Sequence, residues 1–374
     1  MRSPFPWFLL VVASLALVGS YAHGEDLIVR MGGKSTRVFQ VTKATFTEIS
    51  FIPREGLKEQ KIPRENVRRI RFGDTPAAYT AGIDLLRKGE FENAIKAFKE
   101  ARTDPSVRGW WASVWCQRYI AEAYVGWARQ KKDKAKAAEA VKVVNAVTAE
   151  YADNFFKPDL QALLVEALIE AGEPAKAIDA ADALEKEAAT WKDKTWYVRA
   201  KALGAQAMVS AKRYPAAISK LDTLVTFANS NNLPDWATEA QILKGNVILM
   251  QGNKDQALNA FKDLVNRIDK SWSNRAAASA YVGLGRVLLD HFNKPDEARE
   301  HLLTARVVYC GTDKKDIEVM AEAAYFLGRA NEALVGVEGP SARLAAKSYY
   351  EEIVKFYKTS SWLDKAKERL QKLS

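Results

Sequence analysis

Cysteine and histidine are scarce in this sequence. Among 374 residues there are only two cysteines, Cys116 and Cys310, and three histidines. The cysteines stand far apart in the chain, whereas zinc sites are built from close pairs such as C-x-x-C, so we expect two buried free thiols. His23, His291 and His301 include no pair at helical i, i+4 spacing. The sequence therefore predicts no metal site and no catalytic histidine.

Motifs of the common enzyme classes are also missing. The chain has no G-x-S-x-G, no H-E-x-x-H and no phosphate-binding glycine loop. Acidic residues are plentiful, but on the expected helices they alternate with lysine, as in "EKEAATWKDK", which is typical of solvated faces. We therefore predict a protein that is not an enzyme, with no cofactor, while catalysis by paired carboxylates stays open.

Beyond its first residues the chain has no apolar run of the ~20 residues that span a bilayer. The opening "MRSPFPWFLLVVASLALVGSYAHG" carries Arg2, a short apolar run, and small residues Ser20 and Ala22 ahead of an expected cut. This is the layout of a secretory signal peptide, residues 1–22. We predict export to the periplasm or cell envelope, with an uncleaved N-terminal anchor as the alternative.

The net charge of +10 is spread along the chain. Residues 25–74 contain 11 Lys/Arg against 7 Asp/Glu, and the run "RQKKDKAKAAEAVK" (129–142) contains six basic residues. A basic excess favours anionic partners, although it is more often a soluble surface. Because an exported protein rarely meets RNA, we do not expect nucleic acid, and we expect membrane contact only peripherally or through an uncleaved anchor.

Residues 23–74 differ from the rest of the chain and are expected to form a small β domain. "DLIVRM" alternates Leu27, Val29 and Met31 on one face, a Gly-Gly turn follows, and later segments are rich in Val, Thr, Phe and Ile. About five short strands predict an antiparallel barrel or roll. Its strand order resembles an Sm-like barrel, a family whose members bind RNA or form rings. We expect a docking or self-association module.

Helical periodicity runs over residues 75–374, and a small residue recurs in it with a period near 40. The aligned positions are Ala94, Ala138, Ala177, Ala217, Ala257, Ala298 and Ala346, with Ala140 as an alternative to Ala138. Such a period predicts an all-α solenoid of about seven helical hairpins, so that the whole chain is an α+β multidomain protein. In the seventh repeat Gly328 aligns with the first-helix glycines only if "LVGVEGPS" is an inserted loop.

The surrounding residues have a mechanical explanation. Gly89, Gly172 and Gly252 each stand five residues before an aligned alanine, where a helix ends in a left-handed turn. The alanine lies where the two helices of a hairpin cross, and Phe98 and Phe261 fill the core four residues further on.

The repeats resemble the tetratricopeptide family, whose members hold protein partners. In the first repeat Gly82, Ala94 and Phe98 match the small and large signature positions of the family, and in the fifth Gly245, Ala257 and Phe261 do. The period near 40 exceeds the family's usual ~34, which implies longer helices. The segments 150–168 and 349–373 are similar to the repeats of an outer-membrane assembly lipoprotein and a Tol–Pal-associated periplasmic factor, which implies scaffolding at the cell envelope.

Aromatic residues are the best candidates for partner contact. Trp111 and Trp115 share one helix face, while Trp196 and Trp236 stand at the starts of later first helices. Such residues are more often core than surface, but a groove lined by aromatic side chains is the functional alternative.

Three functions fit these observations. The first is an exported, non-enzymatic scaffold or adaptor that binds a protein partner of unknown identity through its repeats. The second is a structural protein that oligomerises through the β module. The third is an envelope protein that binds or hydrolyses cell-wall glycan.

Overall fold

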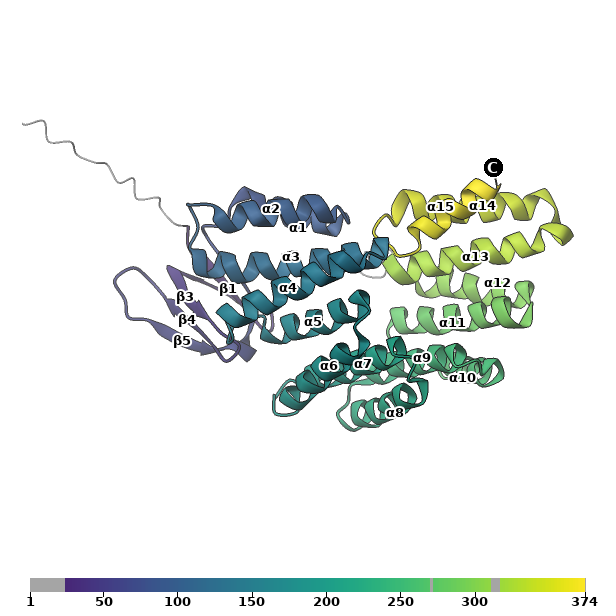
Figure 1. Cartoon of the computed structure of the whole chain (residues 1–374), viewed down its shortest axis with the longest axis horizontal. Helices are drawn as coiled ribbons and strands as arrows, with labels where there is room; N and C mark the ends of the chain where they lie inside the picture. The colour runs from purple at the N-terminus through teal and green to yellow at the C-terminus, as the bar shows by residue number, and fades with distance from the viewer. Residues whose placement is uncertain (1–23, 270–271, 311–316, 374) are drawn as a thin grey trace, which may run out of the picture.

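The structure is a computed structural model that describes residues 24–269, 272–310 and 317–373. The expected signal peptide and His23 lie outside these ranges. The described chain forms six strands followed by fifteen α-helices (Figure 1). No helix within the described ranges is both long and apolar enough to cross a membrane.

The β segment contains two three-stranded antiparallel sheets, with strand orders β2-β1-β6 and β3-β4-β5. The strands are β1 (Asp26–Arg30), β2 (Ser35–Val38), β3 (Gln40–Ala44), β4 (Glu48–Ile52), β5 (Gln60–Pro63) and β6 (Val67–Arg71). A single residue, Phe39, separates β2 from β3, so the chain passes directly from one sheet to the other.

The expected small antiparallel β segment is confirmed, but of the two forms that the sequence left open, barrel or roll, the described residues do not form a closed barrel. No strand of the second sheet pairs with β6 in the described residues, because the 3-10 turn η1 (Arg64–Asn66) returns the chain to the first sheet. The side chains of β1 that point into the core are also not the ones that the sequence predicts. Asp26 and Ile28 are buried, whereas Met31 is 62% exposed. A carboxylate can occupy this inward position because it is paired with an arginine, as described below.

The helical part is a series of antiparallel hairpins, as the repeat period predicts. The seven hairpins are α1 (Ala77–Arg87) with α2 (Phe91–Thr103), α3 (Gly109–Lys131) with α4 (Lys134–Glu150), α5 (Lys157–Ala171) with α6 (Pro174–Ala188), α7 (Lys194–Ser210) with α8 (Tyr214–Ser230), α9 (Pro234–Met250) with α10 (Lys254–Asn266), α11 (Asn274–Phe292) with α12 (Pro295–Thr304), and α13 (Ile317–Glu338) with α14 (Pro340–Phe356). A π-helical turn, η2 (Ala305–Tyr309), follows α12, and α15 (Leu363–Leu373) ends the described chain.

Small residues occupy the helix crossings of these hairpins. The aligned alanines are completely buried in all repeats but the second: Ala94, Ala177, Ala217, Ala257, Ala298 and Ala346. In the second repeat Ala138 is only half-buried, and its neighbour Ala137 occupies the crossing instead. The amide of Ala137 bonds the carbonyl of the residue before its helix, as that of Ala94 does in the first repeat. In repeat two the alanine at the helix crossing is therefore Ala137, one residue before the predicted Ala138.

Glycines in the first helices lie against large side chains of the second helices. A Cβ added at Gly82 would come within 2.8 Å of the Phe98 ring, and one at Gly245 within 2.9 Å of the Phe261 ring. The hairpin turns use the left-handed region, with φ of 73° at Gly89, and similar positive values at Gly172 and Gly252.

The last repeat corrects a second expectation. The alignment of Gly328 with the other glycines assumes that "LVGVEGPS" is an inserted loop, but the first five of these residues belong to α13. Gly328 nevertheless takes the place of the other first-helix glycines, because a Cβ added there would come within 2.6 Å of the Tyr350 ring. The segment that the sequence predicts as an inserted loop is therefore mostly helix.

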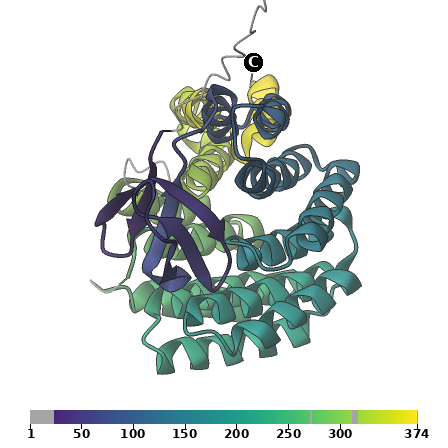
Figure 2. The same cartoon turned by 90° about the vertical axis from the view of Figure 1, so that its left-hand side faces the viewer.

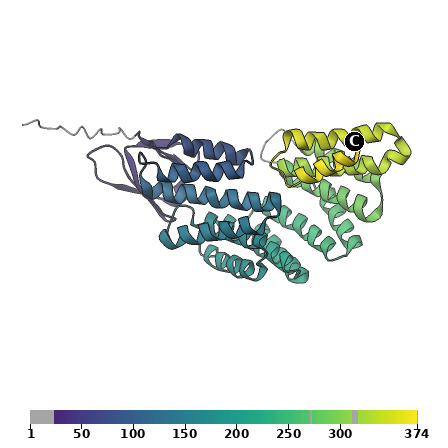
Figure 3. The same cartoon turned by 45° about the horizontal axis from the view of Figure 1, so that its top comes forward.

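The hairpins follow a superhelical path, seen end-on in Figure 2. After this turn the C-terminal helices lie beyond the ends of the first repeats (Figure 3). The connection between α14 and α15 contacts α3 there, since Gln130 donates to the carbonyl of Lys358 at 3.3 Å. The first turn of α15 also contacts α3, where Lys131 pairs with Asp364 at 3.6 Å. The two ends of the solenoid are thus in contact.

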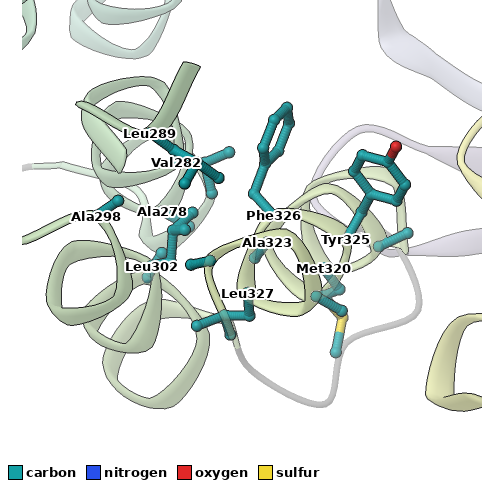
Figure 4. Packing of buried hydrophobic residues seen from close by; sticks show 14 of the residues in the cluster. Ala278, Val282, Leu289, Ala298, Leu302, Met320, Ala323, Tyr325, Phe326 and Leu327 are labelled. Carbon is teal, nitrogen blue, oxygen red and sulfur yellow. The ribbon is translucent and has the colours of Figure 1, made fainter. Parts of the chain in front are cut away.

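Each part of the solenoid has its own hydrophobic cluster. In the C-terminal cluster the small side chains of Ala278, Ala298 and Ala323 lie among larger ones from α11, α12 and α13 (Figure 4). Another cluster joins both sheets to α3, α4 and α5, and contains Ile28, Phe51 and Trp111 among others. The β segment and the first helices therefore share one core.

A buried ionic cluster fixes this junction. Arg108, just before α3, bonds the carboxylates of Asp26 at 2.6 Å and Asp74 at 2.8 Å. The indole of Trp111 donates to Asp74 at 3.0 Å. Burial raises the pKa of Asp74, but its bonds to Arg108 and Trp111 outweigh burial and hold the pKa below its usual value.

Candidate functional site

Two hollows on the first helices of the hairpins form one inner groove. The larger, about 610 Å³, is lined by residues of α3, α5, α7, α9 and α11, together with Leu224 of α8. The smaller, about 500 Å³, is lined mainly by α1, α3, α5 and α7, with Thr359 from the connection before α15. Both include Arg129, Glu166 and Arg199, so they adjoin. Volumes of this size are typical of ligand sites.

The larger hollow combines an apolar lining with charges of both signs. Its apolar residues include Ile169, Leu203, Ile242, Leu243 and Trp236. Its charged residues are Arg129, Arg199 and Arg275 together with Glu166, Glu170 and Glu239. A lining of this kind suits a ligand with apolar side chains and both donors and acceptors, rather than a uniformly charged polymer.

Ion pairs join successive first helices along the groove. Arg129 of α3 lies 2.8 Å from Glu170 and 3.4 Å from Glu166, both of α5. Arg199 of α7 approaches Glu166 from the other side at 3.5 Å and lies over the ring of Trp196. These side chains are therefore held in place before any ligand arrives.

Two groove carboxylates have raised pKa values. Burial raises the pKa of Asp159, opposed by the charges of Arg118 and Arg199. Burial also raises the pKa of Glu239, opposed by Arg275. Asp159 is half-buried, so its charged form is less stable there than on an open helix, whereas Glu239 remains exposed.

The groove charges follow the repeat period, a signal that our reading of the sequence missed. Arg118, Asp159, Arg199 and Glu239 stand 40 or 41 residues apart on α3, α5, α7 and α9, and their charges alternate in sign. We treated charged helix residues as solvated faces. Charges that recur with the repeat, always on the first helix, instead mark one line along the inner surface.

Two of the predicted contact residues are core residues. Trp111 is completely buried and Trp115 is 4% exposed. Trp111 stacks on Phe72 with ring centroids 4.4 Å apart, and Trp115 packs on Phe155 at 5.4 Å. The β segment covers the face of α3 that the sequence left open, and we withdraw these two residues as partner contacts.

The other two tryptophans lie nearer the groove. Trp236 is half-buried and lines the larger hollow. Trp196 is half-buried beside Arg199 and packs on the cluster of α5, α6 and α7. Only Trp236 therefore offers its ring to a ligand in the groove.

The two cysteines lie in different environments. Cys116 is buried in α3, and burial raises the pKa of its thiol to about 12. Cys310 is half-buried rather than buried, because it follows η2 at the end of a helix. Across the residues that the structure describes, no three His, Cys, Asp or Glu side chains lie so that they can hold a metal ion.

No protein-family model matches the sequence, and no curated protein matches it. Among solved structures, the chain is similar to a tetratricopeptide repeat protein from Parabacteroides merdae, at 14% identity and a TM-score of 0.47, over 80% of this chain and 98% of that one. It is similar to a Rap protein complexed with competence and sporulation factor, at 15% identity and a TM-score of 0.45, over 81% and 77%.

A third similar structure is the putative kinesin light chain of Podosopora anserina with nearly identical TPR-like repeats. It shares 15% identity, with a TM-score of 0.39, over 50% of this chain and 92% of that one. These neighbours are TPR-like repeat proteins.

Proposed function

We propose that this protein is a non-enzymatic scaffold or adaptor that holds an extended segment of a partner protein in its inner groove. The observation that carries the proposal is the continuity of the two hollows through Arg129, Glu166 and Arg199. A groove that crosses several repeats presents a long surface, and an extended polypeptide is a ligand that can follow it.

The groove lining supports a polypeptide over a polyanion. Apolar contacts from Leu243 and Trp236 accommodate side chains, while the paired arginines and glutamates present donors and acceptors for a peptide backbone. A polyanion requires unpaired cations, but Arg129 and Arg199 are already paired with glutamates. The groove therefore favours a polypeptide over a polyanionic ligand.

We further propose that the protein acts after export, in the periplasm or cell envelope. The support is the sequence of residues 1–22, with its apolar run and the small residues Ser20 and Ala22. Fractionation of expressing cells, with mass spectrometry of the mature N-terminus, tests this. A protein found in the cytoplasm with Met1 retained would contradict it.

Self-assembly through sheet edges is the weaker alternative. The edge strand β5 has four residues, carries Lys61 and ends in Pro63, and β6 exposes several arginines. Short length, proline and charge are features by which natural sheets avoid edge pairing. The β segment therefore does not favour a ring built from its edges.

Peptide selection tests the groove. A displayed library of random peptides is selected on the purified protein, and the affinity of the enriched peptides is measured by fluorescence anisotropy. Gln206 lines the larger hollow and is exposed on α7, so Gln206→Trp fills the groove. We expect the enriched peptides to bind this variant at least tenfold more weakly than they bind the original protein.

Gln256→Trp is the matched control, because Gln256 is equally exposed on α10 and lines none of the hollows described here. Binding to this variant is expected to stay within twofold of the original. Equal binding to both variants, or a selection that enriches no peptide, would overturn the proposed function.

A further inference from the structure

One face of the first sheet concentrates arginine. In the antiparallel register Leu27 of β1 lies between Arg37 of β2 and Arg71 of β6, and Val29 lies opposite Arg69. Directly paired residues of antiparallel strands project from the same side of a sheet. All three arginines are exposed, and we call them the basic face. The exposed cations Arg30 and Lys34 flank the turn that joins β1 to β2.

These cations lack partners within the described chain. Arg37, Arg69 and Arg71 form no ion pair there, and several carboxylates of the β segment are paired with other cations. Lys61 pairs with Glu48, Lys192 with Glu65, and Arg108 with Asp26 and Asp74.

One carboxylate does lie on this side of the sheet. Glu25 joins Arg37 and Arg71 around a hollow of about 330 Å³ over Leu27. One carboxylate does not balance the three arginines of the basic face, which therefore stays positive.

An exposed apolar side chain lies at the edge of the basic face. Met31 follows β1 between Arg30 and Lys34 and is 62% exposed. Its amide donates to the carbonyl of Asn66 at 2.9 Å, which holds the turn beside the start of β6. An apolar tip flanked by cations is the arrangement by which proteins bind the headgroup region of a membrane.

The basic face lies apart from the groove. The β segment occupies one end of the molecule, in front of the helical turn in Figure 2. None of its residues lines the two hollows of the inner groove. A surface that binds the basic face therefore leaves the groove accessible.

We propose that the basic face binds the surface of an anionic membrane, with its arginines on lipid phosphates and Met31 among the headgroups. Guanidinium groups bind phosphate oxygens through two hydrogen bonds, which explains why arginine rather than lysine predominates. This inference does not depend on the proposed function, since the two surfaces share no residue.

Sedimentation with vesicles tests the proposal on the full chain. We expect binding to vesicles of phosphatidylcholine with 30% phosphatidylglycerol, and little binding to phosphatidylcholine alone. A triple variant, Arg37→Gln, Arg69→Gln and Arg71→Gln, removes three cations. Since one cation contributes about a fivefold change in membrane affinity, the variant is expected to bind roughly a hundredfold more weakly.

The matched control removes three exposed cations of the solenoid, Lys186→Gln, Arg213→Gln and Lys262→Gln, and so has the same net charge. We expect it to bind nearly as the original does. If it loses as much affinity as the triple variant, overall charge explains the binding and the proposal fails. Circular dichroism and peptide binding establish that both variants are folded, and separate this result from any failure of the groove.

Met31→Ser distinguishes a membrane from a soluble polyanion. Loss of the apolar tip is expected to weaken vesicle binding several-fold and to leave the binding of inorganic polyphosphate unchanged. If polyphosphate binds as tightly as vesicles do, and Met31→Ser weakens neither interaction, the basic face binds a soluble polyanion. That result would overturn the membrane proposal. Absence of binding to anionic vesicles would also overturn it.

Discussion

At the junction of the β segment with α3, large groups fill the interface. Phe72 stacks on Trp111, and Arg108 lies between two carboxylates with only 12% of its side chain exposed. In the hairpins, by contrast, close packing depends on missing side chains. The ring of Phe261 lies against Gly245 on one side and Gly283 on the other. The junction is therefore sensitive to the loss of a group, and the repeats are sensitive to the addition of one.

The junction should give the largest effect. Arg108→Met keeps the length of the side chain but leaves Asp26 and Asp74 without their partner, and their side chains are 0% and 2% exposed. Breaking a buried pair by removing one partner costs about 3–5 kcal/mol, because a charge remains buried and unpaired. We expect a loss of this size in the free energy of unfolding measured in urea.

Arg87→Met is the matched control, since Arg87 pairs with Asp84 at 3.3 Å while 75% of its side chain is exposed. A surface pair of this kind contributes at most about 1 kcal/mol. Equal losses in the two variants would show that the buried cluster does not hold the junction. Limited proteolysis should also release the β segment more readily from the Arg108→Met variant alone.

The repeats should respond to one added methyl group. A Cβ at Gly283 would lie 2.2 Å from the Phe261 ring, so Gly283→Ala forces the ring or the helices to move. Overpacking of this kind costs about 1–3 kcal/mol. Phe261→Leu should make room, so that the double variant loses less than the two single losses together. Additive losses in urea unfolding would show that the contact between the two residues is not the cause.

Gly336 provides the control for this experiment. It also lies within a helix, α13, but a Cβ there would meet nothing within 4 Å. Gly336→Ala is expected to leave stability unchanged or to raise it by about 0.5–1 kcal/mol, because alanine favours the helix. A loss as large as that of Gly283→Ala would attribute the effect to glycine itself rather than to packing.

The difference between the two regions also explains what the sequence could predict. The repeats could be recognised because small residues such as Ala94 and Ala257 must recur wherever hairpins cross. The junction could not be recognised, because it is a single contact among Asp26, Asp74 and Arg108, which no period relates. A lone aspartate at the start of an apolar strand gives no sign in the sequence that it is buried against an arginine.

The inner groove was partly predictable from the sequence, and so lies between the repeats and the junction in this respect. Its charges recur with the repeat, so they were readable in the sequence, but a charged residue on a helix is usually solvated and we gave it no weight. The burial of Trp111 and Trp115 was not readable, because it depends on the docking of the β segment onto α3. Residues that contact only their own or the next repeat were thus easier to predict than those that contact a different region.

A third contact joins the two ends of the solenoid, and breaking it should have the smallest effect on stability. The size of that effect shows whether the solenoid depends on this contact. Lys131 of α3 pairs with Asp364 of α15 at 3.6 Å, and about half of each side chain is exposed. Lys131→Gln is expected to lower the free energy of unfolding by less than about 1 kcal/mol.

Lys367→Gln is the matched control, because Lys367 pairs with the same carboxylate at 3.8 Å but within its own helix. Equal, small effects mean that each hairpin is stabilised by its neighbours in sequence. A loss above about 2 kcal/mol in Lys131→Gln alone would mean that contact between the two ends supports the whole turn, and with it the shape of the groove.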